Sequence, residues 1–124
     1  MEIRNGYSIG QSDERPWGRW TVVDAGPGFC IKRITVTPGG VLSLQRHVHR
    51  AEDWIVVAGQ GRATIEGEVI DLGRGSRAHI APLATHRIAN PGVSDLVFIE
   101  VQQGDILSES DIERLGDSYG RKCV

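Results

Sequence analysis

The sequence predicts a single all-β domain, built as a sandwich or barrel of short strands. A length of 124 residues suits one domain. Apolar runs of strand length alternate with turns rich in glycine and proline along most of the chain. The 16 glycines are many for this length and indicate many tight turns. No segment leaves room for a strand–helix–strand unit, so an architecture with helices packed on a parallel sheet is excluded.

The individual strands lie between these turns. Glycine and proline mark turns at residues 25–28, 38–40, 59–61 and 90–92. We expect strands at 19–24, 29–37, 41–49, 53–58, 62–66, 69–72, 76–81, 85–89 and 95–102. After its first residue the segment 53–58 is continuously apolar, which predicts a strand that is buried on both faces.

The two ends of the chain depart from this pattern. Residues 1–13 carry no periodicity, so we expect an N-terminal arm there, either loose or added as an edge strand to a partner, and a folded domain at 14–124. Near the C-terminus, Ser110 and Glu113 have the spacing of a capping box. They predict a short C-terminal helix, interrupted by Gly116 and Gly120, that closes one end of the barrel or lines its pocket.

Composition excludes several classes of function. A net charge of −2 provides no overall basic field for a nucleic-acid partner. No apolar run approaches the length of a membrane span, and the N-terminus lacks the apolar stretch of a signal peptide. We therefore expect a soluble, cytoplasmic protein without membrane contacts. In that reducing compartment Cys30 and Cys123 are expected as free thiols, with a single disulfide between them as the alternative.

Potential metal ligands gather in the segment after Gly40. Side chains alternate between the two faces of a strand. A strand at 41–49 would therefore direct three polar groups to one face, namely Gln45, His47 and His49. The other face would carry Arg46, Val48 and Arg50, and the carboxylates Glu52 and Asp53 follow directly. Imidazole, amide and carboxylate groups gathered in this way are typical of a site for a divalent metal.

The spacing of these residues resembles the first motif of the cupin superfamily. That motif is matched by Gly39, Gln45, His47, Glu52 and Gly59, with glutamine in place of the first histidine. The second motif is matched by Gly75, His86 and Asn90. The resemblance implies a cupin double-stranded β-helix, which is a jelly-roll-like barrel, with a metal held inside by both motifs.

A closer resemblance, over residues 13–121, is to the type II mannose-6-phosphate isomerase domain. It is carried by the segments 14–18, 43–52, 85–87, 90–92, 99–102 and 118–121. In many bacteria this domain is the C-terminal part of a bifunctional enzyme with mannose-1-phosphate guanylyltransferase. No glycine-rich nucleotide loop precedes Arg15, so we expect no guanylyltransferase within this chain. The chain departs from the family at Asp53, where histidine is usual, in the turn at 81–84, and at Ile106.

The resemblance implies metal-dependent interconversion of mannose 6-phosphate and fructose 6-phosphate, in the supply of GDP-mannose and polysaccharide precursors. The expected ligands of the divalent ion are Gln45, His47, Glu52 and His86. Zinc is the expected ion, with manganese, cobalt, nickel and iron as alternatives. His49 is an alternative ligand or the acid–base group, and Asp53 is the second candidate for that base.

Phosphate recognition calls for cationic side chains. The resemblance favours Arg50, which is also a catalytic candidate, followed by Arg87 and Arg121, while Lys32 and Arg33 are weaker candidates. A homodimer is expected, because half-barrels of this kind often bury an apolar sheet face against a second copy. Two alternatives to isomerisation remain open, a non-catalytic cupin that binds a sugar phosphate and an iron-dependent cupin oxygenase.

Overall fold

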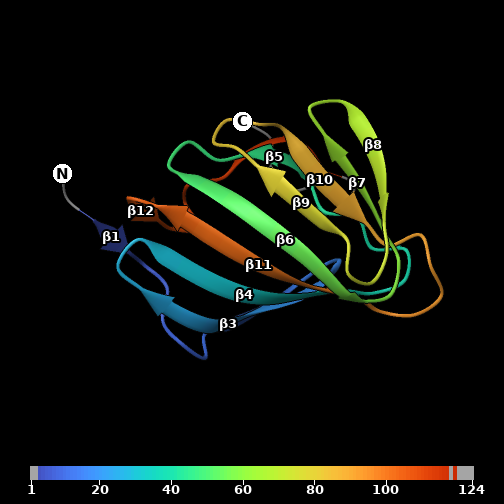
Figure 1. Cartoon of the computed structure of the whole chain (residues 1–124), viewed down its shortest axis with the longest axis horizontal. Helices are drawn as coiled ribbons and strands as arrows, with labels where there is room; N and C mark the ends of the chain where they lie inside the picture. Colours follow the sequence, from blue (N-terminus) through green and yellow to red (C-terminus); the bar gives the residue numbers. More distant parts are fainter. Residues whose placement is uncertain (1–2, 118, 120–124) are drawn as a thin grey trace.

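The computed structural model describes residues 3–117 and 119, and over these residues every regular element is a β-strand (Figure 1). The strands are β1 Arg4–Asn5, β2 Ser12–Arg15, β3 Gly18–Gly26, β4 Phe29–Val36, β5 Leu44–Arg46, β6 Arg50–Ala58, β7 Gly61–Ile65, β8 Glu68–Leu72, β9 Arg77–Ile80, β10 His86–Ala89, β11 Leu96–Gly104, β12 Ile106–Leu107 and β13 Glu113–Gly116. This confirms the predicted all-β class. The described part of the chain has no helix able to span a membrane.

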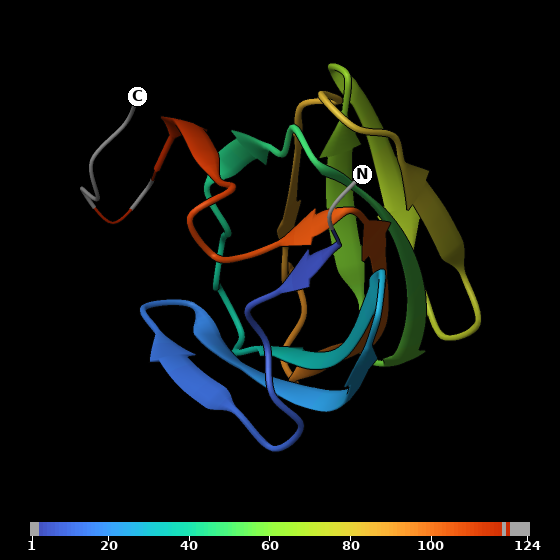
Figure 2. The ribbon, with the colours of Figure 1, turned by 90° about the vertical axis from the view of Figure 1, so that its left-hand side faces the viewer.

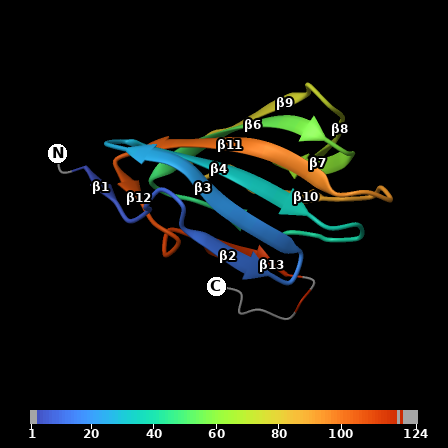
Figure 3. The ribbon, with the colours of Figure 1, turned by 90° about the horizontal axis from the view of Figure 1, so that it is seen from below.

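Two open sheets face each other and enclose one apolar core (Figure 2). The larger sheet has six strands in the order β2-β3-β4-β11-β6-β9, and the smaller has five in the order β13-β5-β10-β7-β8. A parallel pair, β1-β12, lies at one end of the molecule (Figure 3). The core between the sheets includes the almost fully buried side chains of Val22, Val36, Val56, Ile88, Leu96 and Phe98.

Each of the nine expected strands has a counterpart in this architecture. Alternation explains the inward-facing residues, because every second side chain of β11 is buried, namely Leu96, Phe98, Glu100 and Gln102. Polar residues therefore enter the interior in register with the apolar core residues. The strand expected at 41–49 is an exception, since only its central part, β5, is regular.

The predicted C-terminal helix is wrong for the described residues. The segment that contains Glu113 forms β13, which pairs antiparallel with β5. Glu113 accepts two hydrogen bonds from the guanidinium of Arg46 on β5, at 2.7 and 2.9 Å. These cross-strand contacts compete with the helix that the local capping-box pattern favours, because sheet pairing depends on a partner far away in the sequence.

The apolar segment in β6 is buried on one face rather than on both. Trp54 and Val56 point into the core, with 3% and 1% of their surface exposed. Ile55 and Val57 point outward and are 38% and 44% exposed. The prediction of burial on both faces is therefore wrong, and the outer face of the six-stranded sheet carries apolar side chains in this region.

The N-terminal segment packs against the body of its own chain. β1 pairs with β12, and β2 pairs with β3. Tyr7, between them, is buried and meets Trp20 edge-on, with ring centroids 6.0 Å apart. Residues 4–15 therefore contribute to the sheets and to the wall of the interior. Cys30 is also buried, whereas Cys123 lies outside the described residues.

Candidate metal centre and substrate pocket

A bend between β5 and β6 sets the geometry of the candidate site. The strand stops after Arg46, and the carboxylate of Asp111 accepts hydrogen bonds from the backbone N–H groups of Val48 and His49, at 3.0 and 2.9 Å. The bend breaks the alternation expected for a continuous strand. As a result His49 is exposed and Arg50 is buried, the reverse of the predicted arrangement.

Three predicted ligands converge inside the molecule. The ligand atoms of His47, Glu52 and His86 all lie within 4.8 Å of one another, and all three side chains are buried. Nε2 of His47 is 3.3 Å from Oε2 of Glu52, and Nε2 of His86 is 3.7 Å from Oε1. They come from the bend, from β6 and from β10, so both sheets contribute to the cluster.

Backbone carbonyls orient both imidazoles. Nδ1 of His47 donates to the carbonyl of Asp111 at 2.6 Å, and Nδ1 of His86 donates to that of Ala84 at 2.9 Å. A carbonyl only accepts, so each ring carries a proton on Nδ1, and in the neutral form of His47 the Nε2 lone pair faces Glu52. Burial lowers the pKa of His47 to about 4, which keeps this ring neutral. Imidazoles that are held in this way by backbone carbonyls are typical of metal ligands.

The carboxylate of the cluster is held in its charged form. Burial acts most strongly on the pKa of Glu52 and would raise it. The nearby guanidinium of Arg50, together with a hydrogen bond from Glu100 and the other groups around the carboxylate, outweighs burial and holds this pKa well below its ordinary value. Nε of Arg50 donates to Oε2 of Glu52 at 2.9 Å, and the indole N–H of Trp54 donates to Oε1 at 3.2 Å. The cluster thus offers two imidazoles and one carboxylate, a donor set that fits a divalent ion.

Glu100 lies against the cluster without belonging to it. Its carboxyl group hydrogen-bonds to Glu52, and Nε2 of Gln102 donates to it at 3.0 Å. Burial and the adjacent Glu52 charge hold the pKa of Glu100 well above its ordinary value. The pair therefore shares one proton at neutral pH, with the charge on Glu52.

Gln45 and Arg87 also reach the pocket. Gln45 on β5 pairs with His86 on β10 and lines the same cavity, and its amide donates to Ser43. This position allows Gln45 to join the cluster as a further ligand. Arg87 lines the pocket as well, while its Nε donates to the carbonyl of Leu42 at 3.2 Å.

The remaining predicted site residues do not meet in the pocket. Asp53 alternates with Glu52 and points to the outer face, where its carboxylate is 2.7 Å from Nδ1 of His79. Both side chains of that pair are about half exposed, at 48% and 61%. His49 is exposed on the bend, and Arg121 lies outside the described residues. Arg33 is exposed, in contrast to its neighbour Lys32.

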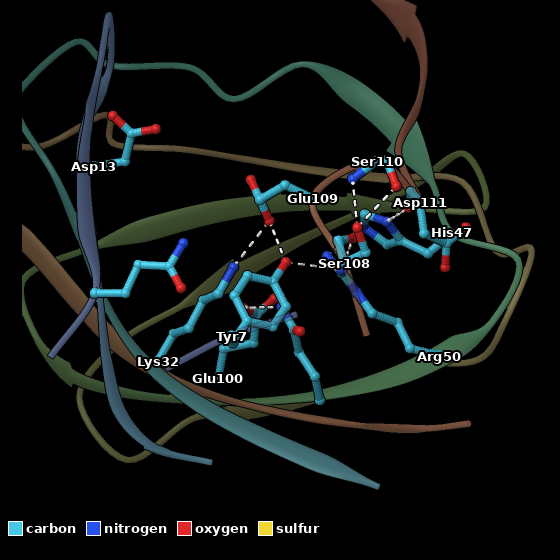
Figure 4. Close-up of polar contacts among 12 residues, drawn as sticks. Tyr7, Asp13, Lys32, His47, Arg50, Glu100, Ser108, Glu109, Ser110 and Asp111 are labelled. Atoms are coloured by element: carbon cyan, nitrogen blue, oxygen red, sulfur yellow. Dashed lines mark hydrogen bonds and ion pairs between the residues drawn. The ribbon is translucent and has the colours of Figure 1, made fainter. Parts of the chain in front are cut away.

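The cavity continues from the cluster to a second group of polar residues (Figure 4). Nζ of Lys32 donates to Oε2 of Glu109 at 3.0 Å, and the Tyr7 hydroxyl donates to the same oxygen. Nη2 of Arg15 donates to Oε1 at 3.2 Å. We call these four residues the Lys32 cluster. Burial acts most strongly on the pKa of Glu109 and would raise it. The charge of the Lys32 ammonium, together with the hydrogen bonds from Tyr7 and Lys32, outweighs burial and lowers this pKa to about 2.

Comparison with known proteins identifies the family. The model of the family described as mannose-6-phosphate isomerase, C-terminal, matches residues 3–117. The chain belongs to this family. It is 51% identical over 107 residues to the mannose-1-phosphate guanylyltransferase ManC of Salmonella typhimurium, and 50% identical over 107 residues to the alginate biosynthesis protein AlgA of Pseudomonas aeruginosa. Each alignment covers 86% of this chain but only 22% of the longer relative.

Solved structures support the fold of this family member. A Klebsiella pneumoniae protein with a double-stranded β-helix domain matches 90% of the chain and 84% of its own, with a TM-score of 0.69 and 20% identity. The cupin domain of Schizosaccharomyces pombe Cnp3 matches 70% of the chain and 64% of its own, with a TM-score of 0.67 and 11% identity. The predicted cupin fold is thereby confirmed.

Four residues to which the structure gives a place in or beside the pocket were absent from the predicted site, namely Glu100, Arg15, Tyr7 and Glu109. Arg15 lies in the segment 14–18, which carries the family resemblance but was not assigned to the site. The alternation of β11 carries a signal for Glu100, which shares the inward face with Leu96 and Phe98. Tyr7 and Glu109 lie in segments without periodicity, so no local pattern directs them inward.

Proposed function

We propose that the chain is a metal-dependent aldose–ketose isomerase that interconverts mannose 6-phosphate and fructose 6-phosphate. The observation that carries this proposal is the buried cluster of His47, Glu52 and His86, which opens onto a pocket that also contains cationic side chains. Membership of the mannose-6-phosphate isomerase family supports the substrate. The names of ManC and AlgA support a role in supplying precursors for polysaccharides.

The residues that would hold the ion are His47, Glu52 and His86, with Gln45 as a further ligand. When bound, a divalent ion supplies Lewis-acid stabilisation of the negative charge that develops on the C1 and C2 oxygens of the sugar. Zinc suits this mixed nitrogen and oxygen donor set, and manganese, cobalt, nickel and iron are the alternatives to test.

The reaction also requires a group that moves a proton between C2 and C1 without being a metal ligand. Glu100 and Glu109 are the carboxyl groups outside the metal cluster among the described residues that line the pocket. Glu109 is bound by Lys32, whereas Glu100 lies directly against Glu52. We therefore assign proton transfer to Glu100 rather than to His49 or Asp53, which lie outside the pocket.

Arg50 provides positive charge beside the reacting groups. Its guanidinium donates to Glu52, and its Nη2 atom lies 3.3 Å from Nε2 of His47. In this position it holds Glu52 ionised and orients the carboxylate. It also lines the pocket, where it can interact with a negatively charged sugar phosphate.

Variants of the metal ligands and of Glu100 test these roles. His47→Ala and His86→Ala should lose metal and turnover together, whereas His79→Ala, which removes an exposed histidine, should retain both. Glu100→Gln should keep the fold and the metal but lose about 10²–10⁴-fold in turnover. Full turnover of the two ligand variants without metal would refute the metal-dependent mechanism, and full turnover of Glu100→Gln would refute its assignment.

A homodimer forms part of this proposal. The outer face of the six-stranded sheet exposes Val23, Ile55 and Val57, at 51%, 38% and 44%. Apolar residues on a sheet face favour packing against a second copy. Light scattering coupled to size-exclusion chromatography should give twice the chain mass, and Ile55→Lys should shift the protein toward the monomer. A monomeric wild-type protein at micromolar concentration would contradict this proposal.

A further inference from the structure

Three hydrogen-bond donors converge on a single carboxylate of the pocket, and two of them, Lys32 and Arg15, line the pocket themselves. Lys32 and Tyr7 both donate to Oε2 of Glu109, and Arg15 donates to Oε1. An ammonium, a hydroxyl and a guanidinium arranged around one anion form a donor set that also binds a phosphate group. Arg15 additionally contacts Asp13 at 3.2 Å, so it is oriented from outside the pocket as well.

The central cation, Lys32, is held by a strand, whereas the anion, Glu109, belongs to the segment that connects β12 and β13. Lys32 lies on β4 and is only 3% exposed, with Nζ held 4.1 Å from the centroids of the Tyr7 and Trp20 rings. Glu109 lies between β12 and β13 in a segment without regular structure, and its side chain is 29% exposed. The central donor is thus held by a strand and two aromatic rings, whereas its present acceptor comes from a segment without regular structure.

The pocket as it stands is too small for a sugar phosphate. The cavity has a volume of about 60 Å³. Sites for small ligands usually measure ~300–1,000 Å³. Glu109 and Ile112, from the same connection, both line this cavity. A sugar phosphate would therefore need part of the connection to move aside, and withdrawal of Glu109 would free both space and three hydrogen-bond donors.

We propose that Lys32, Arg15 and Tyr7 form the phosphate site of the pocket, and that the Glu109 carboxylate occupies it as an internal substitute which the phosphate monoester of the substrate displaces. Lys32 and Arg15 line the cavity that is also lined by Glu52 and His86. A ligand bound at both places would have its phosphate in the Lys32 cluster and its sugar oxygens toward the metal cluster. This inference rests on the proposed function for the identity of the phosphate ligand.

Binding of inorganic phosphate to the full chain tests the inference without reference to turnover. Glu109→Gln removes the competing charge and should bind phosphate about tenfold more tightly than the wild type in calorimetric titration, since an internal competitor acts at a high effective concentration. Glu113→Gln is the matched control, because it removes a carboxylate that pairs with Arg46 outside the pocket. It should bind phosphate as the wild type does.

Two further measurements separate a binding role from a structural one. Phosphate should raise the melting temperature of Glu109→Gln by more than that of the wild type, because a ligand stabilises the folded state that binds it. The double variants Glu109→Gln/Arg15→Gln and Glu109→Gln/Lys32→Met should lose the gain in affinity. The variant Glu109→Gln/Arg15→Gln keeps the test valid even if the buried Lys32→Met change prevents folding, because Arg15 is partly exposed and its replacement should be tolerated.

The outcomes distinguish this inference from the proposed function. If Glu109→Gln binds phosphate no more tightly than the wild type, or if the gain survives loss of Arg15, the phosphate site is refuted even in an active isomerase. If Glu109→Gln gains phosphate affinity through Lys32 and Arg15, the site stands, even where the chain fails to isomerise mannose 6-phosphate at any metal loading. That second result would overturn only the proposed function.

Discussion

Asp111 should stabilise the bend and position a metal ligand at the same time. Its carboxylate accepts hydrogen bonds from two backbone N–H groups of the bend, while its carbonyl accepts one from His47. Asp111→Ala removes the first two directly. At about 1 kcal/mol for each lost hydrogen bond, the free energy of unfolding should fall by about 1–2 kcal/mol. Without these two hydrogen bonds the carbonyl of residue 111 is no longer held in place against His47. Metal affinity should therefore fall about 10–100-fold, as it does when other hydrogen-bond partners of metal ligands are removed.

The assay combines urea unfolding of the metal-free chain with competitive metal titration against a fluorescent chelator. Asp111→Asn keeps one acceptor oxygen and should fall between the wild type and Asp111→Ala in both measurements. Asp71→Ala is the control, because Asp71 is an exposed partner of Arg62 far from the bend. Unchanged metal affinity in Asp111→Ala, with stability lowered as expected, would show that this connection does not position His47 and would refute the reasoning.

Three further predictions follow from the same geometry. The pKa of His47 is lowered from an ordinary 6.5 to about 4 in the folded chain. As the pH falls from 6.5 to about 4, this histidine is protonated in the unfolded chain but not in the folded one, so the free energy of unfolding should fall by about 3 kcal/mol over that range and should not change above it. NMR titration of the ring in metal-free protein checks the value, and a pKa near 6.5 would contradict it. Arg50→Met leaves Glu52 buried without its guanidinium and should lower the free energy of unfolding by about 3–5 kcal/mol in urea titration; a variant as stable as the wild type would contradict this pairing. Gly104→Ala would place a Cβ 1.9 Å from the carbonyl oxygen of His49, so it should lower the melting temperature sharply, and a normal melting curve would show that the bend is free to shift.

Strand periodicity predicted most of the fold because the pattern is local. In β4 and β11 the alternation of side chains identifies the inward face, and turns with glycine or proline mark the ends. The same reasoning applied to β11 places Glu100 inside, although it was not recognised as part of the site. Sequence alone thus predicted nine of the strands in the described part of the chain, the mannose-6-phosphate isomerase family and the cluster of His47, Glu52 and His86.

Other features depend on contacts between distant parts of the chain. The bend before Arg50 is held by Asp111, which lies more than 60 residues away, so no local pattern shows that the strand stops there. Glu113 likewise pairs with Arg46 of β5, which is distant in the sequence, although the residues next to Glu113 favour a helix. The Lys32 cluster joins β4 to two irregular segments, and only the folded chain brings Tyr7 and Glu109 together.

Isomerisation of mannose 6-phosphate is the measurement that tests the central claim most directly. Purified protein would be stripped with a chelator, reloaded separately with zinc, manganese, cobalt, nickel or iron, and assayed for fructose 6-phosphate in a coupled reaction. We predict turnover with at least one ion and none in the chelated control. Absence of turnover with every ion, in protein shown to have bound the metal, would contradict the proposed isomerase function.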